Sequence, residues 1–268
     1  YEKAAGLNFF AAQRAAKYRI RKGNLMDSSY IYTLLSGGVS DKLTVKRIVR
    51  GLQWTAAELS DGSMGIAMRY PSETIPRMHN DTLVGLSARE AAEAVLSWNQ
   101  EESSEAMAVI NAWYNAPSRV PVRAQKYPYT DACTAGFDTR GKTIGLVGHL
   151  RLGDDVLAHA KQVYILERKP QPGDYPDPAC DFLLPRCDVA LITGSAFSNK
   201  TMPHLLSLCG GAKVIVVGPS TPLCPALLVC GVDRLCGLSV RSDEAVLTAI
   251  AERAETGYRY GDAFRLEK

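Results

Sequence analysis

Four apolar stretches decide the fold of the second half of this chain: KTIGLVGHL at 142–150, QVYILE at 162–167, CDVALITG at 187–194 and AKVIVVGPS at 212–220. Each is short, rich in Val or Ile and continuous rather than alternating, which is typical of strands buried on both faces. The intervening stretches are long enough for crossover helices, expected at 153–160, 177–186 and 199–209. We therefore predict an α/β domain with a Rossmann-like parallel sheet from 142 onward, closed by a last helix at about 242–255.

The first half of the chain has a different pattern. Apolar residues alternate in LTVKRIVR at 43–50, and two further strand-like stretches flank the turn Asp61-Gly62, as in a meander. Two helices follow, over 87–97 and 102–115; the first opens with Ser87 and Glu90 in the spacing of a capping box. Strands followed by segregated helices predict an α+β domain.

These patterns divide the chain into four parts. Residues 1–22 form a basic helical extension, 23–118 the α+β domain, 119–141 a Pro- and Tyr-rich connection, and 142–268 the Rossmann-like domain. The extension carries six Lys or Arg against Glu2, and its amphipathic spacing at 7–22 favours a surface helix over an organelle presequence.

Composition excludes several classes of protein. The net charge is +3, and it is close to zero without residues 1–22, so no broad nucleic-acid surface is expected. No apolar run approaches the roughly 20 residues that span a bilayer, and the N-terminus does not read as a secretory peptide. We expect a cytoplasmic protein, and base rates for such proteins favour a homo-oligomer.

The cysteines give no sign of a metal or redox motif. They are seven in number, and none forms a C-x-x-C pair with another. Reduced, mostly buried thiols are the expected state.

Polar residues follow each of the four predicted strands. Since ligands of such sheets bind beyond the carboxyl ends of the strands, these residues are binding candidates. They are His149 in a glycine turn, Glu167, Thr193 and Gly194 with the nearby Asn199 and Thr201, and Gly218 with Ser220 and Thr221.

Each candidate also has a structural interpretation. Asn199 or Thr201 suits a helix N-cap, and the 218–222 loop passes as turn chemistry. Glu167, about twenty residues after the glycine turn, could hold a ribose hydroxyl or could pair with Arg168 or Lys169. His149 could ligate a metal or act as a base, although the sequence gives it no defined partner. The glycine turn lacks the G-x-G-x-x-G spacing of a dinucleotide site, and no nucleophile elbow is present.

Several of these motifs resemble a specific family. ITGSAFSNKTMPHLL, GPSTPLCPALL and GVDRLCG, with VGHLR and YILERKPQPGDY upstream, are similar to a bacterial and archaeal family of unknown function that is named for heavy-metal chelation. RIVRGLQWTAAEL, DGSMGIAMRY, LSAREAAEAVLSWN and AMAVINAWYN resemble its usual N-terminal partner, which looks like the N-terminal domain of enolase. The resemblance covers about 43–240 and leaves the basic extension 1–22 outside.

The resemblance implies an enolase-N-like domain packed on a Rossmann-like domain, with a site in the cleft between them. Carried over by motif, the strand-end residues become its ligand contacts, and Asn111 could reach the cleft from the other side or be a packed polar residue. The leading hypothesis is a protein that binds a small anionic or metal-chelating ligand, or a divalent or heavy metal ion, with His149 and Glu167 as anchors and metal ligands. Catalytic residues are not assigned.

Two alternatives stay open. One is an enzyme that uses a nucleotide-type cofactor, NAD or S-adenosylmethionine, with Glu167 on the ribose. The other is a scaffold whose cleft has lost its function.

Overall fold

The computed structural model describes residues 29–79, 82–128, 138–150, 152, 157–252 and 257–268. Its α-helices are α2 (Tyr30–Gly37), α3 (Ala88–Glu93), α4 (Gln100–Tyr114), α7 (Cys180–Leu183), α8 (Met202–Leu208) and α9 (Glu244–Glu252). Its strands are β1 (Val45–Arg50), β2 (Trp54–Leu59), β3 (Met64–Met68), β4 (Gln125–Lys126), β5 (Thr143–Val147), β6 (Gln162–Glu167), β7 (Tyr175–Pro176), β8 (Val189–Thr193), β9 (Lys213–Val217), β10 (Arg234–Val240) and β11 (Gly261–Glu267).

The first lobe is built on an antiparallel three-stranded sheet in the order β1-β2-β3, as the alternating pattern predicted. Gly62 adopts a φ of 80°, which the tight turn between β2 and β3 requires. Ser87 caps α3 by accepting a hydrogen bond from the amide of Glu90, at 3.2 Å. The meander and the capping box are therefore confirmed.

Helix α4 covers one face of this sheet at very short range. A Cβ on Gly65 of β3 would lie 2.5 Å from the carbonyl carbon of Asn111, so only glycine lets the strand meet the helix backbone there. The helix is buried from Glu102 to Ala112, polar residues included. Its N-terminal turns are consequently a place where charged groups lie inside the protein.

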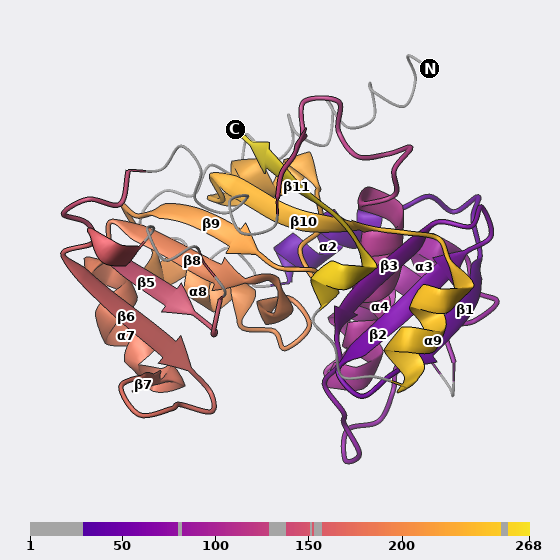
Figure 1. Cartoon of the computed structure of the whole chain (residues 1–268). Helices are drawn as coiled ribbons and strands as arrows, with labels where there is room; N and C mark the ends of the chain where they lie inside the picture. Colours follow the sequence, from indigo (N-terminus) through magenta and orange to yellow (C-terminus); the bar gives the residue numbers. More distant parts are fainter. Residues whose placement is uncertain (1–28, 80–81, 129–137, 151, 153–156, 253–256) are drawn as a thin grey trace.

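The other face of the three-stranded sheet is covered by the end of the chain. Trp54 and Ile66 share a buried apolar cluster with Val240 of β10 and with Leu247 and Ile250 of α9. Figure 1 shows α9 lying beside β1 and β2, on the opposite side of the molecule from β5 and β6. The two lobes are thus held together by a continuous apolar core.

The second lobe is an eight-stranded sheet in the order β4-β11-β10-β9-β8-β5-β6-β7. From β10 to β7 all neighbours are parallel, whereas β11 is antiparallel to both β10 and β4. The chain runs outward from β5 to β6 and then returns to β8 on the other side of β5. This reversal is the place where doubly wound sheets bind ligands.

Part of this lobe differs from the sequence prediction. The chain does not close with the helix at 242–255: α9 covers 244–252, and β11 follows it. Strands β10 and β4 were also missed, the latter inside the predicted connection 119–141. β11 was overlooked because its charged residues alternate irregularly and only its pairing with β10 orders it as a strand. The expected helix at 199–209 is shorter, at 202–208.

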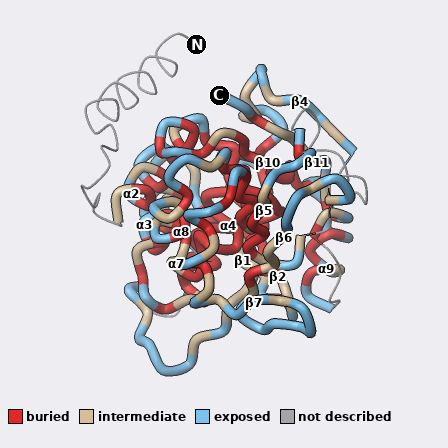
Figure 2. Tube along the Cα trace, turned by 90° about the vertical axis from the view of Figure 1, so that its left-hand side faces the viewer, coloured by how far each residue is buried: buried red, intermediate tan, exposed pale blue. Residues whose placement is uncertain are grey.

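Some expectations fall where the structure gives no description. The predicted helix at 7–22 lies wholly outside the described residues, and the one at 153–160 lies partly outside them. Within the described part of the chain, no helix is long and apolar enough to cross a membrane. Figure 2 shows the buried positions concentrated in the interior around α4 and β5.

Candidate functional site

The strand-end loops of β5, β8 and β9 lie side by side, as the sequence predicted. The register pairs Val147 with Ile192 and Thr193 with Val217, so all three strands end at one edge. Gly148 follows β5 with a φ of 97°, and a Cβ on it would lie 3.2 Å from Cγ2 of Thr193. The loops therefore pack directly on one another.

Gly194 and Gly218 continue this chain of close contacts. A Cβ on Gly194 would come within 2.8 Å of the amide nitrogen of Thr221 and closer still to its hydroxyl. Gly218, with a φ of 123°, places the corresponding position 3.9 Å from the amide nitrogen of Gly194. Loop packing alone explains why these residues are glycine, and their contact with a ligand stays a prediction.

The same loops meet the first lobe along what we call the interlobe interface. It comprises Met68, Tyr70, Ser103 and Asn115 on one side, and Asn199, Lys200, Ser220 and Thr221 on the other.

Ser220 and Thr221 are buried in this interface, whereas Asn111 is buried against β3 within the first lobe, and its contact with a ligand stays a prediction. The hydroxyl of Ser220 accepts a hydrogen bond from the amide of Met68, at 2.8 Å. The side chain of Asn111 donates to the carbonyl oxygen of Ile66, also at 2.8 Å. Oδ1 of Asn111 and Oγ1 of Thr221 are buried without a hydrogen-bond partner. The interface thus holds the lobes together, and the hydroxyl of Thr221 is the buried polar group there that a ligand could satisfy.

Asn199 acts as a link between the lobes rather than as a helix cap. Its Oδ1 accepts from the amide and hydroxyl of Thr201, at 3.2 and 2.7 Å, and its Nδ2 donates to the hydroxyl of Tyr70, at 3.2 Å. Thr201 occupies the N-cap position of α8 without a side-chain capping bond. Thr193 lies at the end of β8, with its hydroxyl 3.0 Å from that of Ser195.

Lys200 lies between Asn199 and Thr201, and it is a functional candidate that was not predicted from the sequence. It has a φ of 69°, and it is the one non-glycine residue with positive φ in the described part of the chain. Its Nζ donates to Oγ of Ser103, at 2.9 Å, and lies 4.6 Å from the ring centroid of Tyr32. In the sequence, Lys200 could have been noticed because it follows a predicted strand and lies between Asn199 and Thr201, two residues that commonly cap helices.

The environment of Lys200 disfavours its charge. Burial lowers the pKa of Lys200 to about 8, against an opposing contribution from the Glu102 carboxylate. No carboxylate of the described residues lies within ion-pair distance of the ammonium group. A strained backbone and a partly desolvated amine together make Lys200 a candidate functional residue.

His149 and Glu167 lie at the same edge, beyond β5 and β6. The Nε2 of His149 is 2.8 Å from Oδ2 of Asp174, whose side chain is 5% exposed. The carboxylate of Glu167 accepts a hydrogen bond from the amide of Arg168, at 3.1 Å. The structure therefore supplies His149 with the partner that the sequence could not name.

A protein-only metal site is not evident at this edge. Among the described residues, no group of three or more His, Cys, Asp or Glu side chains could hold a metal ion. The described cysteines are all buried thiols. Burial raises the pKa of Cys209 to about 12 and that of Cys187 to about 11, so these thiols stay protonated at neutral pH.

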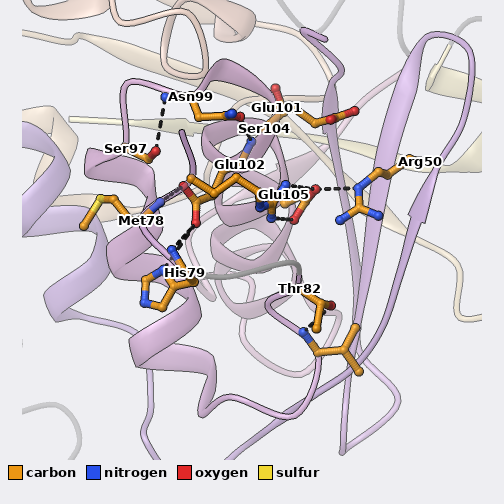
Figure 3. Close-up of polar contacts among 12 residues, drawn as sticks. Arg50, Met78, His79, Thr82, Ser97, Asn99, Glu101, Glu102, Ser104 and Glu105 are labelled. Carbon is orange, nitrogen blue, oxygen red and sulfur yellow. Dashed lines mark hydrogen bonds and ion pairs between the residues drawn. The ribbon is translucent and has the colours of Figure 1, made fainter. Parts of the chain in front are cut away.

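Two buried glutamates lie on α4 of the first lobe (Figure 3), and one of them, Glu102, acts on Lys200. Glu102 accepts hydrogen bonds from the amides of Met78 and His79, at 2.7 and 2.8 Å. Burial raises the pKa of Glu102, but hydrogen bonds from Ser97, His79 and Met78 outweigh it, and the net pKa is below the ordinary value. Glu102 is therefore ionised inside the protein.

Glu105 is paired with two arginines. Arg50 Nε donates to it at 2.6 Å, and Arg77 donates through both terminal nitrogens at 2.6 and 3.1 Å. Arg69 donates to Oε1 of Glu101 through Nε and Nη2, at 2.9 and 2.6 Å. Segment 69–79 is thus bound to α4 at several points. It includes Tyr70, whose hydroxyl accepts the hydrogen bond from Asn199.

A separate surface cavity of about 440 Å³ lies at the β4–β11 edge. Its lining residues are Lys126, Tyr127, Pro128, Tyr258, Gly261, Asp262 and Ala263. It contains none of the residues that the sequence nominated.

The fold and the interface define a class: a two-lobed α/β protein whose parallel-strand loops are closed by a helix of an antiparallel lobe. Two family models, both described as "Putative heavy-metal chelation", match residues 32–114 and 134–261. The chain belongs to this family, DUF364 with its N-terminal partner DUF4213, and the resemblance seen in the sequence is confirmed.

Solved structures agree. The chain is similar to a protein of unknown function from the DUF364 family of Desulfitobacterium hafniense, with 32% identity and a TM-score of 0.78, covering 90% of this chain and 98% of that one. It also shares its fold with a family member from Pyrococcus horikoshii, with 22% identity and a TM-score of 0.72, covering 91% of this chain and 100% of that one. A comparison with curated proteins gave no match.

Proposed function

We propose that this protein binds a small anionic, metal-chelating ligand at the interlobe interface, with Lys200 as the anchor of its negative charge. The observation that carries the proposal is the partly buried ammonium of Lys200, which has a strained backbone and only a neutral hydroxyl, that of Ser103, as hydrogen-bond acceptor. A bound oxyanion would compensate a charge that the protein leaves unpaired.

The side chains that could ligate a metal favour a metal–chelate complex over a bare metal ion as the bound species. Since no three-donor group exists among the described side chains, a metal ion at His149 or Glu167 would need its remaining ligands from another molecule. Asp174 would orient the imidazole, as second partners of ligating histidines commonly do. We assign His149 and Glu167 to the metal end of the ligand, and Asn199, Thr201, Ser220 and Thr221 to its oxygen end.

The fold-level part of the proposal follows the family. We infer that the three-stranded lobe is enolase-N-like and that the parallel sheet is Rossmann-like, packed so that the strand-end loops face α4. The reversal of strand order at β5 and β8 supports this placement of the ligand.

Thermal-shift measurements test the proposal. Wild type, Lys200→Met and His149→Ala are heated with metal salts alone, with oxalate or citrate alone, and with both together. We expect the carboxylate chelators to raise the Tm of wild type, and Lys200→Met to lose most of that rise. His149→Ala should lose only the additional rise that metal gives. If no chelate raises the Tm, or if Lys200→Met responds fully, the proposal fails.

A nucleotide-type cofactor is the second candidate, favoured by the place of Glu167. It ends β6, the neighbour of β5, where acidic residues of dinucleotide sites hold a ribose. Release of NAD or S-adenosylmethionine on denaturing the purified protein would support this function over the first.

A further inference from the structure

We infer that Lys200 is a carbonyl-reactive amine, and that the anion bound at the interlobe interface is a small aldehyde or 2-oxo acid which forms an imine with it. This inference rests on the proposed function, because it names the ligand class of the same site. Chelating anions and 2-oxo acids share a carboxylate beside a second oxygen, so the same site can take either, with Lys200 bonded to the carbonyl carbon in the second case.

The geometry separates Lys200 from the other lysines that the structure describes. It lies in the loop after β8, at the edge where ligands of this sheet type bind, and its φ of 69° is a backbone conformation that carries an energetic cost. Nζ is held between the Ser103 hydroxyl and the face of the Tyr32 ring. An amine held in one place by a strained loop is pre-organised for attack on a bound carbonyl.

The surroundings of the amine also favour its neutral form. Tyr32 of α2 is buried and burial raises its pKa, so this neighbour brings no negative charge. Glu102 of α4 is the carboxylate that acts on Lys200, and it is occupied by the amides of Met78 and His79. With a pKa of about 8 instead of 10.5, roughly a tenth of Lys200 is neutral at pH 7, against far less than a hundredth for an ordinary lysine.

The step balances without an oxidant or reductant. The nitrogen lone pair of the neutral amine adds to the carbonyl carbon, and a C–N bond forms while the carbonyl oxygen takes the π electrons and a proton. The first proton on that oxygen comes from the amine nitrogen; the second amine hydrogen is lost when the hydroxyl leaves as water, and a C=N bond remains. The carboxylate of the ligand stays unchanged and available to the neighbouring hydroxyl and amide groups.

Glyoxylate is the probe, because it is the smallest aldehyde that carries a carboxylate. The full chain is treated with glyoxylate and cyanoborohydride at pH 7, digested, and mapped by mass spectrometry, so that each imine is trapped as a secondary amine. We expect Lys200 to be modified at least tenfold faster than the exposed Lys161, which serves as reference within the same sample. Lys200→Arg should abolish modification at 200 and leave Lys161 unchanged, whereas Lys161→Arg should leave the rate at Lys200 unchanged.

Oxalate, which has two carboxylates and no aldehyde, distinguishes the two proposals. If Lys200 reacts no faster than Lys161, the imine inference is overturned. The anionic site itself stands in that case if oxalate still raises the Tm of wild type but not that of Lys200→Met. If Lys200 reacts fast and oxalate neither slows the reaction nor raises the Tm, the reactive amine stands and the chelate proposal fails.

Discussion

Asn115 joins the two lobes through Thr221: its Nδ2 donates to the carbonyl oxygen of Thr221 at 2.9 Å. The same amide donates to Leu238 at 3.1 Å, and its Oδ1 accepts from the amide of Leu223 at 2.7 Å. Because Asn115 is fully buried, this one side chain satisfies three main-chain groups that no solvent reaches. The loop that carries Ser220 and Thr221 is therefore positioned by the end of α4.

Replacing this side chain should be costly. Asn115→Ala leaves three buried main-chain groups unpaired, and we expect the free energy of unfolding to fall by about 3 kcal/mol or more. Urea denaturation measures it. The exposed Thr248→Ala on α9 is the control and should change stability by less than about 0.5 kcal/mol. An Asn115→Ala protein as stable as that control would contradict the role given to this residue.

The packing of the strand-end loops makes a second prediction. A Cβ at Gly194 would overlap Thr221, so Gly194→Ala should destabilise the protein by about 2 kcal/mol or more. Gly211, before β9, has nothing within 4 Å of its Cβ position, and Gly211→Ala should be neutral or stabilising by under about 1 kcal/mol. Thermal denaturation of the two variants compares them directly. Equal stability of both would show that the loops are not closely packed.

The buried Glu102 predicts a dependence of stability on pH. Because its pKa in the folded protein lies below the ordinary 4.5, its stabilisation is complete above that pH and is lost as pH falls through the folded-state pKa. Glu102→Gln should lose about 1–2 kcal/mol at neutral pH and show a shallower fall below pH 4.5 than wild type. Denaturation midpoints across this range, with the exposed Glu252→Gln as control, measure both effects. If the denaturation midpoints of wild type and Glu102→Gln fall in parallel with pH, the prediction is wrong.

The strained backbone of Lys200 should lower the free energy of unfolding of the wild-type protein. Glycine adopts a positive φ without the cost that a lysine bears, roughly 1–2 kcal/mol, although it adds freedom to the unfolded chain. We expect Lys200→Gly to raise the free energy of unfolding by about 0.5 kcal/mol while abolishing the Tm response to chelators. A loss of more than about 1 kcal/mol would mean that Lys200 is a structural residue.

The sequence predicted the parallel sheet well because its evidence is local. Each of β5, β6, β8 and β9 is a continuous apolar run bounded by glycine or charge, and their shared edge follows from topology alone. Strand β10 is buried throughout, yet Arg234 and Ser239 break its apolar pattern. Its partner β11 is set by that pairing and by no periodicity of its own.

The site was predicted only in part, for a related reason. Strand-end position nominated Asn199 and Thr201, but the importance of Lys200 comes from its φ and from Ser103 and Tyr32, residues far away in sequence. Glu102 looked like the first turn of an amphipathic helix and became a buried carboxylate only because segment 69–79 folds over it. Asp174, the partner of His149, likewise follows from tertiary structure.

Native mass spectrometry of the freshly purified protein, followed by denaturation of the same sample, tests the central claim most directly. Wild type should carry a small anionic adduct, with or without a metal ion, that is released on unfolding. Lys200→Met should lack the adduct, and Lys161→Met should retain it. A bare metal ion as the bound species, or an adduct that persists in Lys200→Met, would contradict the account.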